Sequence, residues 1–123
     1  MSRSDDRRFP GSVFRVGKEP DVRFTLANER TFLAWIRTSL ALVAGGVALE
    51  TLGLDLQPDL RLAASLVLIV AGTAVPLLAW GGWMRIERAL RHGSPLPSTV
   101  VGVALAVVVV VVGMLVLLGV LLR

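Results

Sequence analysis

Several kinds of side chain on which enzymes depend are missing or nearly missing from this sequence of 123 residues. It contains no cysteine, no tyrosine and a single histidine, His92. Without cysteine there is no disulfide, no thiolate nucleophile and no cysteine-ligated metal, and one histidine alone does not make a metal site. No Ser–His–Asp arrangement, phosphate-binding glycine loop or pair of catalytic acids can be assembled from what remains. We therefore expect no enzymatic activity, no catalytic residue, no bound metal and no cofactor.

Charged side chains are absent from two long apolar stretches, residues 62–82 and 99–122. The chain is 54% hydrophobic, with a mean hydropathy of +0.74, whereas a soluble domain is usually about 45–50% apolar. The excess lies in three blocks, each long enough to cross a bilayer, which takes roughly 20 residues. The sequence therefore predicts an all-α integral membrane protein with three transmembrane helices over residues 25–49, 62–84 and 99–122, the first extended at its cytoplasmic end.

Residues 1–21 differ from the rest because they are polar, carry both charge signs and are interrupted by proline and glycine. This composition is typical of a mobile segment. We predict a mobile cytoplasmic tail there and a membrane domain over residues 22–123. The tail has no short apolar core of the kind found in cleavable signal peptides, so we expect the first transmembrane helix to serve as an uncleaved insertion signal.

Basic residues are distributed unevenly over the segments that flank the predicted helices. Cytoplasmic segments of membrane proteins carry an excess of lysine and arginine. The first connector has one basic residue, Arg61, whereas the N-terminal segment and the second connector hold Arg3, Arg7, Arg8, Arg15, Lys18, Arg23, Arg30, Arg85, Arg88 and Arg91. We therefore predict a multi-pass protein of the cell (inner) membrane with a cytoplasmic N-terminus and the C-terminus outside. Trp35, Trp80 and Trp83 are then expected to be anchors at the cytoplasmic interface, where tryptophan is enriched.

The first predicted helix carries two arginines on one face. At 100° per residue Arg30 and Arg37 fall on the same side, and the positions that continue this side are alanines. Small residues let neighbouring helices approach closely in lipid, so we expect this face to look inward, toward protein or a water-filled space. Two other interpretations of Arg37 stay open. Its side chain snorkels back to the lipid headgroups, or it belongs to a structural ion pair.

Arginines near the ends of the first two helices suggest a cationic site at the inner surface. If the second helix continues beyond the membrane, Arg85 and Arg88 line one side of it. Together with Arg30 and Arg37 they are expected to form a vestibule for an anion or polyanion, because arginine grips phosphate through paired hydrogen bonds. Binding of anionic lipid headgroups by the same cluster is the alternative.

An acidic residue near this cluster, Glu29, finds no partner four residues further along its own helix. We expect it to form an ion pair with Arg85 or Arg88. The alternative is that Glu29 is solvated and favours the positive end of the helix dipole. In the third helix, Gly102 and Gly113 share a face that would let a neighbouring helix pack closely.

The run Leu26-Ala-Asn-Glu-Arg-Thr-Phe-Leu-Ala-Trp-Ile-Arg-Thr-Ser-Leu-Ala-Leu resembles the signature of the YidH-like family of small bacterial membrane proteins, catalogued as a domain of unknown function. Its Asn-Glu-Arg-Thr-Phe-Leu-x-Trp core, which begins at Asn28 and Glu29, is specific for its length. An arginine-rich segment at residues 83–93 and three similarly spaced spans complete the resemblance. The family is similar to the membrane domain of the eukaryotic vacuolar transporter chaperone complex, which makes and translocates polyphosphate. This similarity implies several subunits around a central pathway, with Arg30 and Arg85 in its cationic lining and Glu29 in an ion pair.

Three functions fit these features to different degrees. The first is a non-enzymatic inner-membrane subunit of an oligomeric channel or translocation element for anions or polyphosphate. The alternative is a non-conducting scaffold or accessory subunit that docks a partner through the first helix. A proton-coupled transporter of small molecules fits less well, because the second and third spans contain no carboxylate or histidine. The expected partners are the lipid bilayer, further copies of this chain, and a polyanion or anionic lipid headgroups, but no nucleic acid.

Overall fold

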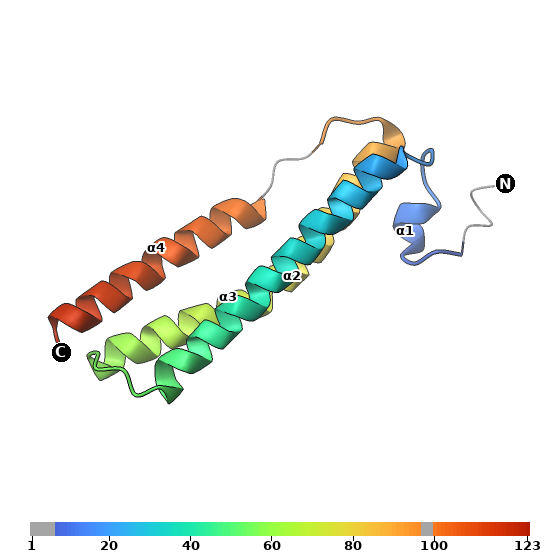
Figure 1. Ribbon diagram of the computed structural model, residues 1–123. Helices are drawn as coiled ribbons and strands as arrows, with labels where there is room; N and C mark the ends of the chain where they lie inside the picture. Colours follow the sequence, from blue (N-terminus) through green and yellow to red (C-terminus); the bar gives the residue numbers. More distant parts are fainter. Residues whose placement is uncertain (1–6, 97–99) are drawn as a thin grey trace.

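The computed structural model describes residues 7–96 and 100–123. Within these ranges the chain forms a single-turn helix, α1 (Gly11–Phe14), and three long helices, α2 (Val22–Thr51), α3 (Pro58–His92) and α4 (Val100–Leu121). α2 and α3 lie side by side and antiparallel, α4 runs along the first part of α3, and α1 lies near the opposite end of the α2–α3 pair (Figure 1). All three long helices are long and apolar enough to cross a membrane. The predicted all-α fold with three transmembrane helices is therefore confirmed.

Capping residues fix the starts of α2 and α3. The carboxylate of Asp21 accepts a hydrogen bond from the N–H of Arg23 at 2.9 Å, and the side-chain oxygen of Gln57 accepts one from the N–H of Leu60 at 2.8 Å. Each bond satisfies a backbone donor that has no partner inside its helix. α3 ends before Gly93, whose φ of 65° is the left-handed conformation in which glycine commonly terminates a helix.

α3 extends further toward the second connector than predicted. It ends at His92 rather than at residue 84 and begins at Pro58 rather than at residue 62. The polarity of the segment after residue 84 indicates a place outside the membrane, but arginine, alanine, leucine and glutamate are also good helix formers. No glycine or proline interrupts them before Gly93, so the helix continues out of the apolar region.

The other two long helices lie close to their predicted bounds. α2 occupies residues 22–51 where we predicted 25–49, and α4 occupies residues 100–121 where we predicted 99–122. Residue 99 lies outside the described residues. The sequence pattern therefore locates the described ends of α2 and α4 to within three residues.

Residues 7–21, which we predicted to be part of a mobile tail, instead pack against the last turns of α3. Arg91 organises the contact: it donates a hydrogen bond to the carbonyl oxygen of Phe14 at 3.1 Å and forms a salt bridge with Glu19 at 3.0 Å. The side chain of Arg91 is only 2% exposed as a result. Composition alone predicted a mobile tail because it does not reveal that Glu19 of this segment pairs with Arg91, which is distant in the sequence. Residues 1–6 of the predicted tail lie outside the described residues.

Two arginines surround the carboxylate of Glu19. Arg8 donates two hydrogen bonds to it, at 3.0 and 2.8 Å, in addition to the contact with Arg91. The hydrogen bond from Arg8 is the largest cause that lowers the pKa of Glu19 below its usual value; burial opposes it as the second largest effect, and the charges of Arg91 and Arg8 lower the pKa further. Gly17, with a φ of 62°, lets the backbone come close here: a Cβ at this position would lie 2.5 Å from the carbonyl oxygen of Arg91.

Two reciprocal contacts between serine and glycine join α2 to α3. Ser39 of α2 donates a hydrogen bond to the carbonyl oxygen of Gly72 at 2.5 Å, and Ser65 of α3 donates one to that of Gly46 at 2.6 Å. The serine and the glycine are seven residues apart in both helices, so antiparallel pairing places each serine opposite the glycine of the other helix. A Cβ at either glycine would lie 2.5–2.7 Å from a side chain of the partner helix. The two backbones are therefore in close contact and leave no room for a water-filled path between them.

α4 packs mainly on α3. Near its start, Val101 joins a small buried core shared with α2 and α3, and near its end the carbonyl oxygen of Gly119 accepts a hydrogen bond from the N–H of Gln57 at 3.0 Å. A Cβ at Gly102 or Gly113 would meet no atom within 4 Å. In the described part of the chain, no helix therefore packs closely against the glycine face predicted for α4.

Candidate functional site

A fully buried carboxylate lies between α2 and α3, in the part of this helix pair that extends past the level at which α4 begins. Glu87 of α3 is 0% exposed. One of its oxygens accepts a hydrogen bond from the side-chain amide of Asn28 at 3.4 Å, and the other accepts one from the hydroxyl of Thr25 at 3.5 Å. The same Asn28 amide donates to the backbone carbonyl of Trp83 at 3.1 Å. Asn28 therefore ties α2 to α3, and it supplies the buried carboxylate with a donor that a buried polar group requires.

The ion pair predicted for Glu29 with Arg85 or Arg88 is not formed. Glu29 is exposed and takes part in none of the salt bridges among the residues that the structure describes. The reason is its angle on the helix. Glu29 lies 100° around α2 from Asn28, and Asn28 is the residue that faces α3.

Sequence reasoning missed Glu87 as a site residue, although a signal was available. Glu87 follows Trp83 by four residues, so the two side chains fall on one face of a helix. A carboxylate on the same face as a large aromatic residue is drawn into the helix interface and needs a donor there. The amide of Asn28 on the preceding helix is such a donor.

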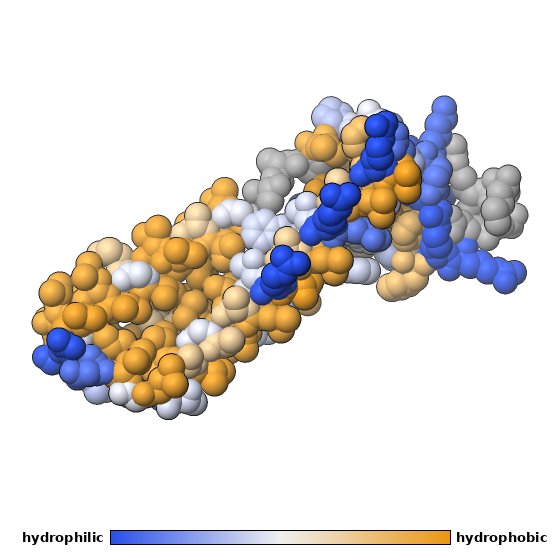
Figure 2. Space-filling view, in the orientation of Figure 1, coloured by the Kyte–Doolittle hydropathy of each residue, from blue (hydrophilic) through white to orange (hydrophobic). Residues whose placement is uncertain are grey.

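The arginine face of α2 points away from α3. Arg30 and Arg37 are both exposed, and neither forms a hydrogen bond or salt bridge within the described ranges. We predicted that this face looks inward, but Asn28 and Ser39 face α3 instead, about 160° around the helix from the arginines. Hydrogen bonds across the helix pair and the close approach of the two backbones favour packing of the Asn28–Ser39 face on α3, rather than packing of the alanine face. Figure 2 shows separate hydrophilic patches that follow α2 into the apolar surface of the molecule.

Arg37 lies near a membrane boundary rather than at the bilayer centre. α4 has 22 residues and is about 33 Å long at 1.5 Å per residue, close to the roughly 30 Å of a hydrocarbon core. Its start therefore marks one boundary. Trp35 packs against the core cluster that contains Val101 at this start, and Arg37 lies only about 3 Å further along the α2 axis. Because helical side chains lean toward the N-terminus, the Arg37 guanidinium can reach the headgroup region.

The four arginines of the predicted vestibule do not come together in one chain. Arg88 donates a hydrogen bond to the carbonyl oxygen of Ser12 at 3.1 Å, so it contacts the N-terminal segment. Arg85 is exposed at the edge of a pocket that neither Arg30 nor Arg37 lines. The described part of the chain therefore does not form the predicted vestibule from these four arginines.

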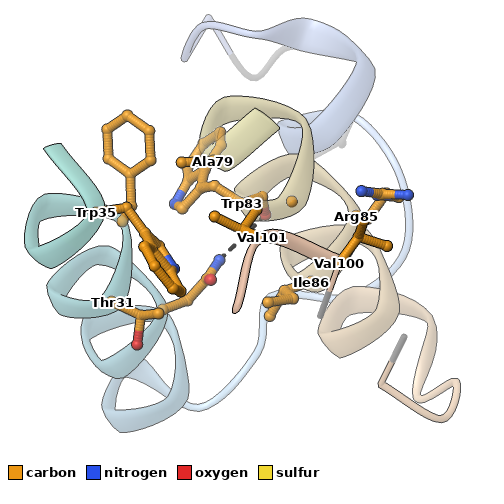
Figure 3. A pocket seen from close by; sticks show the side chains of 11 residues that line it. Thr31, Trp35, Ala79, Trp83, Arg85, Ile86, Val100 and Val101 are labelled. Atoms are coloured by element: carbon orange, nitrogen blue, oxygen red, sulfur yellow. Dashed lines mark hydrogen bonds between the residues drawn. The ribbon is translucent and has the colours of Figure 1, made fainter. Parts of the chain in front are cut away.

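The pocket lies between α2, α3 and the start of α4, directly beside the Asn28–Glu87 contact. Figure 3 shows Thr31 and Trp35 on one side of it and Arg85 with Val100 on the other. Its cavity volume is about 40 Å³. Aromatic and polar side chains of α2, aromatic and cationic side chains of α3 and the first two valines of α4 meet there.

The predicted tryptophan anchors gather at this end of the molecule. The rings of Trp80 and Trp83 stack with centroids 5.2 Å apart, Phe32 meets the Trp80 ring edge-on, and Phe14 covers Trp83 at 6.1 Å. Trp83 is only 7% exposed, so it joins the packing of the helices instead of facing lipid. Trp35 and Trp80 keep part of their surface available to the surroundings.

These features define a class of protein: a small multi-pass membrane protein with three transmembrane helices, whose first two helices are joined by a buried asparagine–glutamate contact. The chain belongs to the family described as "Domain of unknown function (DUF202)", which matches residues 23–89. The matched region begins in the first turn of α2 and ends near the end of α3, so it contains both Asn28 and Glu87.

Several similar proteins agree with this assignment. "Inner membrane protein YidH" of Escherichia coli (strain K12) is 42% identical over 110 residues, which cover 85% of this chain and 96% of the relative. "Uncharacterized protein Rv2272" of Mycobacterium tuberculosis (strain ATCC 25618 / H37Rv) is 44% identical over 100 residues, which cover 80% of this chain and 82% of the relative. No solved structure matches the chain. The YidH-like family and a multi-pass place in the inner membrane are therefore confirmed, the latter together with the three apolar helices.

Proposed function

We propose that this protein is a non-enzymatic subunit of a homo-oligomeric inner-membrane assembly that translocates an anion between its copies. The observation that carries the proposal is the exposure of Arg30 and Arg37 on the face of α2 opposite α3, with no partner in the described ranges. Charged residues at or within transmembrane segments usually face a bundle interior or a water-filled cavity, and Arg37 at the membrane boundary, with Arg30 about 10 Å beyond it, would line the mouth of such a cavity. A face turned away from its own chain reaches such an interior only against another copy or another protein.

We place the anion pathway between copies because, in the described part of the chain, α2 and α3 leave no room for one between them. The contacts of Ser39 with Gly72 and of Ser65 with Gly46 close the space between α2 and α3. A ring of copies that turned their arginine faces inward would carry Arg30 and Arg37 from each copy. Rings of arginine are one way in which pores select anions and phosphates.

A phosphate-rich polyanion is the first candidate for the translocated species. Arginine binds phosphate oxygens through paired, charge-assisted hydrogen bonds. If the N-terminus is cytoplasmic, as predicted, Arg30 and Arg37 lie at the cytoplasmic entrance of the pathway, where an anion from the cytoplasm would first contact the protein. The resemblance to the membrane domain of the vacuolar transporter chaperone points to polyphosphate in particular. Of the two arginines that this resemblance carries over, Arg30 belongs to the proposed pathway, whereas Arg85 lies at the pocket on another surface.

The test is the copy number in native-lipid nanodiscs, measured by native mass spectrometry, followed by anion flux in proteoliposomes. We expect a discrete ring of several copies. Arg30→Gln and Arg37→Gln should keep that copy number and lower the flux of short-chain polyphosphate by about tenfold or more, the loss expected for one charge-assisted contact. Arg123→Gln, which removes a charge at the other end of the molecule, is the matched control. A monomer in native lipid would overturn the proposal.

A non-conducting scaffold is the second candidate, and the exposed alanines beside the arginines favour it. Ala34, Ala41 and Ala44 are exposed on α2, and small residues let another helix approach closely. A scaffold of this kind predicts that Arg37→Ala disturbs assembly with a partner protein and that no anion flux appears for any variant. The copy number and the flux together therefore separate the two candidates.

A further inference from the structure

The pocket between α2, α3 and α4 lies at the level where hydrocarbon gives way to headgroups. Val100 and Val101, the first residues of the membrane-long helix α4, form part of its wall. Tryptophan side chains, which prefer this level of a bilayer, form another part through Trp35 and Trp83. α2 and α4 each pack mainly on α3 and less on each other, so a lipid chain can approach the pocket between these two helices.

The lining of the pocket is mainly apolar. Besides the two tryptophans it is formed by Phe32, Ala79, Gly82, Ile86 and the two valines of α4, while buried Asn28, Thr31 and exposed Arg85 supply its polar atoms. Arg85 is exposed and forms none of the salt bridges found in the described ranges. The only acid nearby on the α3 face, Glu87, is buried behind Asn28 and does not line the cavity. The charge available to a ligand here is therefore positive.

We propose that this pocket binds an anionic phospholipid of the surrounding leaflet. The phosphate contacts Arg85 at the edge, and the adjoining part of one acyl chain packs against Trp35 and Trp83. The cavity volume of about 40 Å³ has room for about three groups of the size of a water molecule, which suits a short piece of chain whose remainder runs along the outer surface. A free phosphate ion would leave the aromatic wall unused, and this is why we assign the site to a lipid.

The proposed lipid would stabilise the position of α4 by filling the space between its start and α3. The start of α4 contacts the rest of the molecule through Val101 and its neighbours in the small core, and most of its remaining surface is exposed. A lipid held by Arg85 of α3 and lying against Val100 would add contacts that the chain itself does not supply. This inference uses residues other than Arg30 and Arg37 and stands whether or not the protein translocates an anion.

Two adjacent glycines of α3 allow a matched test. A Cβ at Gly81 or at Gly82 would meet no atom within 4 Å, but only Gly82 lines the pocket. The Cβ of Gly82→Leu therefore meets open space and its side chain starts from the pocket wall, whereas Gly81→Leu makes the same change at a residue that does not line the pocket. Arg85→Gln removes the phosphate contact, and Arg23→Gln removes an exposed charge at the same end of the molecule away from the pocket.

Binding is measured on the full-length protein with phosphatidylglycerol and with phosphatidylcholine. Native mass spectrometry counts bound lipids during titration in detergent. In vesicles, brominated acyl chains of each lipid quench the pocket tryptophans, and a Trp80→Phe background removes the more exposed indole. Circular dichroism and the copy number of each variant show whether it folds and assembles as the parent protein does.

We expect one tightly held phosphatidylglycerol and about tenfold to hundredfold weaker binding for Arg85→Gln, the loss of one charge-assisted contact. Gly82→Leu should lose both the bound lipid and the quenching, while Gly81→Leu and Arg23→Gln keep them. Equal binding of phosphatidylcholine, or unchanged binding by folded Arg85→Gln and Gly82→Leu, would overturn the proposal. Displacement of the lipid by inorganic phosphate would overturn it in favour of a free-anion site.

Discussion

At the scale of single residues, glycine and serine decide how closely α2 and α3 approach each other, and two adjacent glycines of α2 differ sharply in this respect. A Cβ at Gly46 would lie 2.7 Å from Cγ1 of Ile69 and 2.8 Å from the carbonyl oxygen of Ser65. A Cβ at Gly45 would only reach ordinary contact with Leu68, at 3.7 Å. The same change from glycine to alanine therefore tests helix packing at one position and helix propensity at the other.

Gly46→Ala should destabilise the protein by about 1–3 kcal/mol, because overpacking a close helix contact outweighs the roughly 1 kcal/mol that alanine gains over glycine in helix propensity. Gly45→Ala should be neutral or stabilising by up to about 1 kcal/mol. Unfolding in mixed micelles of increasing sodium dodecyl sulfate content, followed by circular dichroism, measures both. Equal responses of the two variants would contradict the close approach of α2 and α3.

Within the Asn28–Glu29 pair of the motif, the two residues have opposite environments. Asn28 is buried and donates to Glu87 and to the carbonyl of Trp83, whereas Glu29 is exposed. Asn28→Ala leaves a buried carboxylate and a buried carbonyl short of a donor and should cost about 1–3 kcal/mol. Glu29→Gln should stay within about 0.5 kcal/mol.

The same unfolding assay decides the comparison between these neighbouring residues. A second variant, Asn28→Ala with Glu87→Leu, tests the cause, because it removes the carboxylate that the asparagine serves. Recovery of part of the lost stability supports the buried contact. If Glu29→Gln were as destabilising as Asn28→Ala, the roles that the structure gives to the two side chains would be refuted.

At the scale of whole elements, the N-terminal segment and the last turns of α3 depend on each other. Residues 7–21 supply carbonyl oxygens and Glu19 to Arg91, and Ser12 supplies a carbonyl to Arg88. In return, the extension of α3 gives the segment a surface on which to pack. This docking holds two of the three arginines that follow Trp83, which leaves Arg85 as the cation available at the pocket.

Docking of this segment should weaken in acid. The pKa of Glu19 is lowered from 4.5 in the folded protein, so the charged form contributes to docking above about pH 4.5 and the contribution is lost as the pH falls through the lowered pKa. A nitroxide on Ser12→Cys reports the change by electron paramagnetic resonance. We expect an immobilised label at pH 7 and increasing mobility below about pH 4.5.

Glu19→Gln should already be mobile at pH 7, because it lacks the charge that Arg8 and Arg91 surround. Asp59→Asn, at the start of α3 on the opposite end of the molecule, is the control and should behave as the parent protein does. Since Glu19 is largely exposed, solvent screens its contacts and we expect local release of the segment without unfolding of the membrane helices. An immobilised label in Glu19→Gln would contradict the assigned contact.

Hydropathy and helix propensity predict the three spans of this protein well, but they do not predict which side of a helix faces which neighbour. Alanine, serine and glycine all count as small residues that allow close helix packing, so the alanine side of α2, with Arg37, was an equally valid inward face from sequence. What distinguishes the true interface is the match between Ser39 and Gly72 on another helix. That match depends on the register of the two helices and is invisible in either helix alone.

The same limit applies to the site near the end of the membrane. Asn28 is predictable as a motif residue, but its partner Glu87 lies 59 positions away in a segment that polarity assigns to a connector. Recognising that α3 continues to His92 would have placed Glu87 on the face of Trp83. Long-range pairing of charges, as between Arg91 and Glu19, likewise needs the fold before it can be inferred.

At the scale of the whole molecule, the unequal lengths of the helices show where the membrane ends. α2 and α3 have 30 and 35 residues, about 45 and 52 Å, whereas α4 is close to the thickness of a hydrocarbon core. α4 is joined to the start of α3 through Gln57 and Gly119, so the excess length projects from the membrane at the other end. α1 lies at that end (Figure 1), which is also where the surface is most hydrophilic (Figure 2).

The distribution of basic residues predicts that this projecting end is cytoplasmic, and the absence of cysteine from the sequence makes the prediction simple to test. Ser94→Cys, in the connector after α3, and Asp55→Cys, in the turn after α2, are both at exposed positions. In spheroplasts a membrane-impermeant maleimide should label Asp55→Cys directly and Ser94→Cys only after permeabilisation. The parent protein, which carries no thiol, provides the background.

The opposite labelling pattern would reverse the orientation and change the functional argument in a defined way. Arg30 and Arg37 would then lie at the outer leaflet, and the proposed pathway would receive anions from outside the cell membrane rather than from the cytoplasm. The pocket beside Arg85 would draw its lipid from the outer leaflet as well. Labelling of both cysteines from outside would contradict three membrane crossings, because the two positions are separated by α3, a single span.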